Sequence, residues 1–191
     1  MPIRAVVFDF FGVISSEIAP VVLPRHMPEA AAIDYKATTV ERADLGEISF
    51  MDTLIDLSQR TGVPAAQLEA EFRGCVRIDP AVVALLDHLH GRYHVALLSN
   101  AMAPFLDEIL EEHDLKRRFD TMVISCQEHL TKPDPAIFRL LLQRLALPAA
   151  DCIFTDDNPI NVEAALAVGM QAVRFEGADK LKTDLAALGV S

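Results

Sequence analysis

The sequence is short of basic residues. Seventeen lysine and arginine residues stand against 28 aspartate and glutamate residues, so the 191-residue chain has a formal net charge of -11 at pH 7. Binding to a nucleic acid backbone needs a basic surface, so this composition argues against DNA or RNA as a partner. The one basic cluster, 116–118, is short and is interpreted as a solvated helix end. An acidic protein that handles phosphate would need a metal ion to hold it.

Cysteine is also scarce, and no apolar run is long enough to cross a membrane. Cys75, Cys126 and Cys152 are an odd set without C-x-x-C spacing, so neither a disulfide framework nor a zinc site is indicated. The chain has no internal repeat, and no charged segment followed by a long apolar stretch opens it. We therefore expect a soluble cytoplasmic protein with no membrane partner.

The sequence does contain an alternation of apolar strands and helices. Five short stretches are apolar on both faces, as expected for parallel strands covered by helices: 3–10, 93–100, 119–125, 151–157 and 170–175. Helical stretches separate them, several beginning with Asp-Pro or Asn-Pro: 79–92, 103–115, 134–147 and 158–169. This alternation predicts an α/β fold with a doubly wound parallel sheet.

The segment between the first strand and the first of these helices breaks the alternation. It has no strong strand pattern, and three of its stretches are helical in character. We predict a core domain formed by 1–14 and 79–191, with 15–78 inserted as a small helical cap. The cap should lie over the carboxyl edge of the sheet, where open α/β sheets bind their ligands.

Polar side chains follow several of the predicted strands. Because parallel strands end at the same edge of a sheet, we expect these side chains to form one site. Carboxylates suit Mg²⁺, a hard cation held by one or two carboxylates together with substrate phosphate. A serine, nearby amides and a lysine would neutralise the remaining oxyanion charge. The candidate residues are Asp9, Ser99, Asn100, Lys132, Asp156 and Asp157.

Four segments carry a family resemblance. The stretches DFFGV, LLSNA, TKPDPAIF and FTDDNPINVEAA, which begin at residues 9, 97, 131 and 154, resemble the four motifs of the haloacid dehalogenase (HAD) superfamily of hydrolases. The order and spacing match over the whole chain, and the helical insert resembles the small cap of subfamily IA. The wording of the last two segments is most similar to the branch with the epoxide hydrolase phosphatase domain and certain sugar phosphatases. The resemblance implies a HAD-like Rossmannoid core and hydrolase activity.

The resemblance also implies roles for single residues. Asp9 would be the nucleophile, forming an aspartyl-phosphate. Asp9, Asp157 and the backbone carbonyl of Phe11 would ligate Mg²⁺, while Asp156 would support the site through water or neighbouring groups.

The phosphate would be held by three further residues. Ser99 and the amide of Asn100 would bind the transferring oxygens, and Lys132 would pair with both the nucleophile and the phosphate.

Phe11 departs from the pattern of most phosphatases in this superfamily, which have a second aspartate there. That aspartate protonates the leaving oxygen and then activates water, and its loss should cost about 10²- to 10⁴-fold, or roughly 3–5 kcal/mol of barrier. Three readings follow: a phosphatase with another proton donor such as Glu17, a metal-independent 2-haloacid dehalogenase, or a non-catalytic relative that binds a phosphorylated ligand. Because two extra acids would repel a haloacid carboxylate, Asp156 and Asp157 favour the first. We expect a phosphatase acting on a small phosphorylated metabolite, as a monomer or homodimer.

Overall fold

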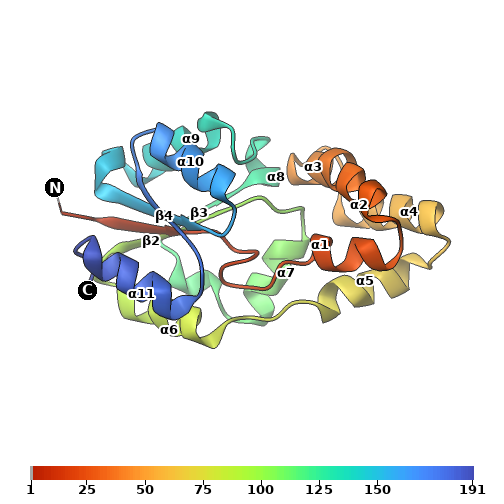
Figure 1. The fold of residues 1–191 in the computed structure, drawn as a ribbon, viewed down its shortest axis with the longest axis horizontal. Helices are drawn as coiled ribbons and strands as arrows, with labels where there is room; N and C mark the ends of the chain where they lie inside the picture. The colour runs from red at the N-terminus through yellow and green to blue at the C-terminus, as the bar shows by residue number, and fades with distance from the viewer. Residues whose placement is uncertain (1) are drawn as a thin grey trace.

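Five parallel strands form one sheet within residues 2–191, the part of the chain that the computed structural model describes. Neighbouring strands pair in parallel along the whole sheet (Figure 1). In sheet order they are β3 (Thr121–Ile124), β2 (His94–Ser99), β1 (Ala5–Phe8), β4 (Cys152–Asp156) and β5 (Gln171–Arg174). The predicted α/β fold with a doubly wound parallel sheet is therefore confirmed, and the chain order reverses between β1 and β4.

The central strand β1 is buried on both faces. Ala5 and Val7 contribute to the hydrophobic core on one side of the sheet, and Val6 and Phe8 contribute to the core on the other side. Successive side chains of a strand point to opposite faces, so four apolar residues in a row fill both cores. This burial fixes the position of the residue that follows the strand.

Helices cover both faces of the sheet (Figure 1). Asp79, Asp134 and Asn158 each cap a helix that starts with proline, as their dipeptides predicted. The covering helices are α6 (Pro80–Leu89), α7 (Phe105–Glu112) and α11 (Ala178–Ala187) on one face, with α9 (Pro135–Leu145) and α10 (Pro159–Ala167) on the other. Shorter turns complete the core: η3 (Lys116–Arg118), α8 (Ser125–Glu128) and η4 (Ala149–Asp151).

The segment 15–78, called the cap segment below, is helical and lies beyond the carboxyl ends of the strands (Figure 1). Its elements are α1 (Ala19–Val22), η1 (Leu23–Arg25), α2 (Glu29–Tyr35), the π-helix η2 (Lys36–Val40), α3 (Glu41–Asp44), α4 (Phe50–Thr61) and α5 (Ala65–Gly74). The elements α2, η2 and α3 follow one another without a break, so they form one helical rod with a π turn in its middle. The division into core and cap as separate units stays a prediction.

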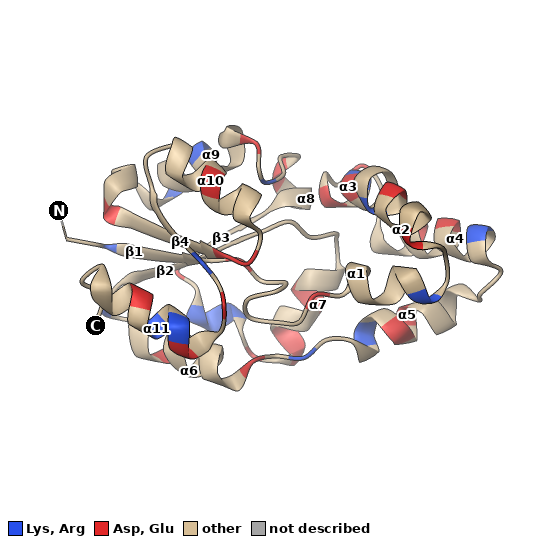
Figure 2. Ribbon diagram, in the orientation of Figure 1, with Lys and Arg blue, Asp and Glu red and all other residues tan. Residues whose placement is uncertain are grey.

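Charged side chains are distributed over many elements (Figure 2). The basic residues of 116–118 are engaged by nearby acids; Arg118 lies 2.8 Å from Asp87 and Lys116 lies 2.7 Å from Glu111. Across residues 2–191, no helix is both long and apolar enough to span a membrane.

Candidate active site

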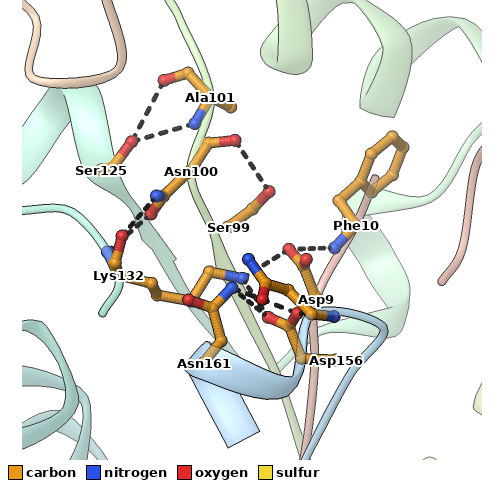
Figure 3. A network of polar contacts seen from close by, with 10 residues as sticks. Asp9, Phe10, Ser99, Asn100, Ala101, Ser125, Lys132, Asp156 and Asn161 are labelled. Carbon is orange, nitrogen blue, oxygen red and sulfur yellow. Dashed lines mark hydrogen bonds and ion pairs between the residues drawn. The ribbon is translucent and has the colours of Figure 1, made fainter. Parts of the chain in front are cut away.

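Asp9 directly follows the central strand β1, and its carboxylate is held by two donors (Figure 3). The Oδ1 atom accepts a hydrogen bond from the backbone N–H of Phe10 at 2.7 Å and lies 2.8 Å from Nζ of Lys132. Asp9 is only 7% exposed. Burial raises the pKa of its carboxyl group, and the ammonium of Lys132 is the strongest opposing influence. The contacts fix one carboxylate oxygen and direct this group to the edge of the sheet.

Lys132 bridges two carboxylates. Its Nζ atom lies 2.8 Å from Oδ1 of Asp9 and donates to Oδ2 of Asp156 at 2.7 Å. Burial alone would lower the pKa of this lysine, but the charges of the two aspartates outweigh that effect and raise it. Lys132 is therefore a buried cation whose charge is neutralised by two adjacent carboxylates.

Asn100 holds the backbone of Lys132 in place. The Asn100 amide Nδ2 donates to the carbonyl of Lys132, and Oδ1 of Asn100 accepts from the N–H of Lys132, both at 2.8 Å (Figure 3). The sequence resemblance implied a phosphate-binding role for the backbone amide of Asn100. The structure adds a role for its side chain, which orders the loop that carries the lysine.

Asp156, at the end of β4, has donors on both of its oxygens. Besides Lys132, the amide Nδ2 of Asn161 contacts Oδ1 and Oδ2 at 3.1 and 3.0 Å, and the N–H of Asn158 donates to Oδ1 at 2.8 Å. Asn158 and Asn161 were not predicted as site residues, although Asn158 was recognisable as a helix cap. With these donors in place, Asp156 mainly positions Lys132.

Asp157 has a freer carboxylate and lies close to the chain after β1. The carboxylates of Asp9, Asp156 and Asp157 each offer one oxygen within 4.8 Å of the others. A Cβ atom added to Gly12, which has a φ of +86°, would lie 2.5 Å from the Asp157 carboxylate, so only glycine leaves room for it. Burial, followed by the charge of Asp156, raises the pKa of Asp157. Clustered anionic oxygens of this kind fit a hard divalent cation such as Mg²⁺.

A cavity of about 290 Å³ opens above these carboxylates. The strand-end residues form its floor, and the cap segment forms much of its wall together with Phe105 of α7. Aromatic rings pack beside it. The ring of Phe11 is stacked on that of Phe105 with centroids 6.2 Å apart, and the centroids of the Phe105 and Phe50 rings are 4.4 Å apart. Apolar wall residues include Phe11, Ile18, Phe72, Met102, Phe105 and Ile160.

The structure brings most of the predicted site residues to this cavity. Among its lining residues are Asp9, Phe11, Asn100, Lys132, Asp156 and Asp157. Ser99 is not among the lining residues: it is fully buried, and its hydroxyl makes a long 3.5 Å contact with the carbonyl of Asn100. The catalytic and phosphate-binding roles of these residues, including Ser99, stay predictions.

The cap segment adds charged residues to the cavity. Lys36, Val40 and Asp44 recur at intervals of four along the α2–η2–α3 rod, and all three line the cavity together with Glu17. Such spacing places side chains on one face of a helix. Glu17 had been considered as a proton donor, whereas Lys36 and Asp44 carry no sequence motif and were not predicted.

Comparison with known proteins identifies the class. The sequence profile of the haloacid dehalogenase-like hydrolases matches residues 3–169. The chain is also 32% identical over 171 residues to the sesquiterpene phosphatase astK of Aspergillus oryzae, covering 87% of both chains. The protein therefore belongs to the haloacid dehalogenase-like hydrolases and is a hydrolase, which confirms the predicted family and enzyme class.

Solved structures of the same family have the same fold. A predicted HAD-like hydrolase from Porphyromonas gingivalis aligns with a TM-score of 0.78 at 23% identity, covering 97% of this chain and 98% of that one. A HAD family enzyme from Bacteroides thetaiotaomicron, crystallised with magnesium and inorganic phosphate, aligns with a TM-score of 0.74 at 19% identity and covers 90% and 93%.

Proposed function

We propose that this hydrolase is a Mg²⁺-dependent phosphatase that cleaves monoesters of phosphate through an aspartyl-phosphate at Asp9. The observation that carries the proposal is the arrangement of Lys132 between Asp9 and Asp156, with Asp157 within reach of the same point. A nucleophilic carboxylate, a buried cation and a metal-binding carboxylate are the groups that phosphoryl transfer needs. The phosphatase relative and the magnesium and phosphate complex described above support this reading.

Each residue of the site has a separate role in the proposed reaction. Asp9, Asp157 and the carbonyl of Phe11 would hold Mg²⁺, which supplies positive charge to the phosphate oxygens. Lys132 neutralises further phosphate charge, and Asp156 and Asn100 keep its ammonium next to Asp9. Asp9 attacks phosphorus, and the bond to the organic oxygen breaks. Water then hydrolyses the phosphoryl-aspartate.

The proposed substrate carries an apolar organic group. The cavity wall above the carboxylates contains the rings of Phe11, Phe72 and Phe105, and Ile160 lies at its exposed side. Such a wall favours a hydrocarbon over a polyhydroxylated sugar, because a buried hydroxyl without a partner costs free energy. The relative from Aspergillus oryzae is named a sesquiterpene phosphatase, which fits an apolar organic group.

A phosphate-release assay tests this function. The full chain is incubated with Mg²⁺ and farnesyl monophosphate, n-octyl phosphate, p-nitrophenyl phosphate and glucose 1-phosphate. We expect hydrolysis that stops on chelation and in Asp9→Asn, with kcat/KM highest for the apolar esters.

Two results would contradict the proposal. The absence of Mg²⁺-dependent turnover with every phosphate would exclude the phosphatase. Halide release from 2-chloropropionate that is insensitive to a chelator would instead indicate the dehalogenase alternative. A preference for glucose 1-phosphate would leave the phosphatase standing but overturn the apolar substrate.

A further inference from the structure

We propose that Asp44 of the cap segment is the general acid and base of this active site, in place of the carboxylate that Phe11 cannot supply. This inference rests on the proposed phosphatase function. Phe11 leaves the position two residues after Asp9 without an ionisable side chain. Any second acid must therefore reach the cavity from another part of the chain.

Asp44 reaches the cavity from the cap segment. It is the third member of the series Lys36, Val40 and Asp44 on the α2–η2–α3 rod, and it shares the cavity with Asp9 and Lys132. Its half-buried carboxyl group has no hydrogen bond or ion pair within the described part of the chain. The group is therefore free to exchange a proton with a substrate held over Asp9.

The end of the rod is fastened to the core. Gly46 adopts a φ of +74° and packs so tightly on α8 that a Cβ atom there would clash with the carbonyl oxygen of Cys126. At the preceding residue, Leu45, the backbone carbonyl accepts a hydrogen bond from Nδ1 of His129 at 2.8 Å. These contacts fix the two residues that follow Asp44, so its position over the site is set by packing between cap and core. A proton donor must be held within reach of its target in this way.

The surroundings of Asp44 bring the pKa of its carboxyl group close to neutral pH. Burial raises the pKa of its carboxyl group to about 7. The charges of Lys36 from the rod and Lys132 from the core lower the pKa, while those of Glu41 and Glu17 raise it further. The thiol of Cys126 on α8 also faces it, with its own pKa raised to about 11 by burial. A carboxyl group with a pKa near the working pH can both donate and accept a proton.

The proposed proton transfers balance over one cycle. An oxygen of Asp9 bonds to phosphorus as the bond from phosphorus to the organic oxygen breaks, and that oxygen takes the proton of Asp44. Water then attacks the phosphoryl group while the Asp44 carboxylate removes a proton from it. The bond from phosphorus to Asp9 breaks, which releases inorganic phosphate and restores the protonated Asp44.

Glu17 is the competing candidate. It also lines the cavity, and burial raises its pKa as well. However, Glu17 also borders a second, outer hollow beside Arg25 and Glu71, so it is in contact with solvent on that side. The backbone next to Glu17 is also held in place, because Ser16 forms hydrogen bonds with Cys75 and Arg77. It is the contact of Glu17 with the outer hollow that favours Asp44.

Three variants and a double variant test the assignment with n-octyl phosphate, whose alcohol is a poor leaving group and needs a proton. Asp44→Asn should lower kcat by about 10²- to 10⁴-fold. Asp34→Asn changes an exposed carboxyl group on the same rod that does not line the cavity, and it should leave kcat unchanged. Glu17→Gln should cost less than Asp44→Asn. Phe11→Asp combined with Asp44→Asn should recover at least tenfold of the lost activity, since it restores a carboxyl group.

A burst experiment gives a readout that a purely structural role would not produce. With p-nitrophenyl phosphate, whose leaving group needs no proton, Asp44→Asn should release nitrophenolate in a burst of about one equivalent of folded enzyme, followed by slow turnover. Equal turnover of n-octyl phosphate by Asp44→Asn and wild type, or a larger loss in Glu17→Gln, would overturn the assignment while leaving the phosphatase intact. Wild-type protein inactive on every phosphate would overturn both.

Discussion

The Nζ atom of Lys132 lies 2.8 Å from Oδ1 of Asp9, and both side chains are more than nine-tenths buried. The same ammonium contacts Asp156, so removing it would leave two buried carboxylates facing each other without a counter-charge. A buried charge without a partner is far more costly than a solvated one.

Lys132→Met should therefore lower the free energy of unfolding by about 3–5 kcal/mol at pH 7.5 in the presence of chelator. Lys180→Met is a matched control, because Lys180 forms an exposed i,i+4 pair with Asp184 and should cost at most about 0.5 kcal/mol. Urea unfolding followed by circular dichroism measures both. An equal loss of unfolding free energy in the two variants would show that the buried contacts of Lys132 contribute no more to stability than an exposed ion pair.

Gly12→Ala should weaken Mg²⁺ binding, because the new methyl group would occupy the space of the Asp157 carboxylate and the backbone has a positive φ. We expect the Mg²⁺ concentration that gives half of the maximal rise in melting temperature to increase at least tenfold. Gly74→Ala provides the control, since a Cβ atom there meets nothing within 4 Å. An unchanged Mg²⁺ response in Gly12→Ala would count against Asp157 as a ligand.

The sheet and its edge were predictable from sequence because their determinants are local. Strands such as β1 and β4 are short apolar runs, and the Asn-Pro start of α10 is a direct helix signal. Parallel strands then force the residues that follow them, such as Asp9 and Asp156, to the same edge.

The cap side of the site was not predictable in this way. Lys36 and Asp44 share a cavity with Asp9 because of tertiary packing such as that of Gly46 on Cys126, a contact across 80 positions of the chain. The resemblance implied a phosphate-binding role for Ser99, which is fully buried and is not among the residues that line the cavity, so that role stays a prediction. Side-chain direction depends on tertiary packing, which short motifs do not encode.

The pH dependence of stability offers a separate test of the Asp44 environment. Its pKa is about 7 in the folded chain against an ordinary value of 3.8, so the folded state retains a proton that the unfolded state loses. This contribution is present at low pH and is lost as the pH rises from about 4 to 7.

Asp44→Asn should consequently be more stable than wild type at pH 7.5, by on the order of 1–3 kcal/mol, with a smaller gap at pH 4.5. Thermal and urea unfolding in chelator at both pH values check this. A gap that stays constant between the two pH values would mean that Asp44 titrates like an ordinary surface carboxyl group.

Substitution at the mouth of the cavity should separate substrate classes. Ile160 is 58% exposed and lines the cavity, whereas Leu166 is 51% exposed on the same helix and does not. Ile160→Ser should raise KM for farnesyl monophosphate about threefold to tenfold, as expected for a lost apolar contact of about 0.7–1.4 kcal/mol. The KM for p-nitrophenyl phosphate should change less, and Leu166→Ser should change neither. Equal effects of the two variants would argue against an apolar substrate group at this position.

Trapping the phosphoryl-enzyme examines the role of Asp9 itself. Full-length protein is mixed with Mg²⁺ and ³²P-labelled farnesyl monophosphate, quenched in acid within the first turnover, digested and analysed by mass spectrometry. We predict a phosphoryl group on Asp9 that requires Mg²⁺, is absent in Asp9→Asn and persists longer in Asp44→Asn. Substrate turnover with no label on Asp9, or label on another residue, would contradict the proposed mechanism.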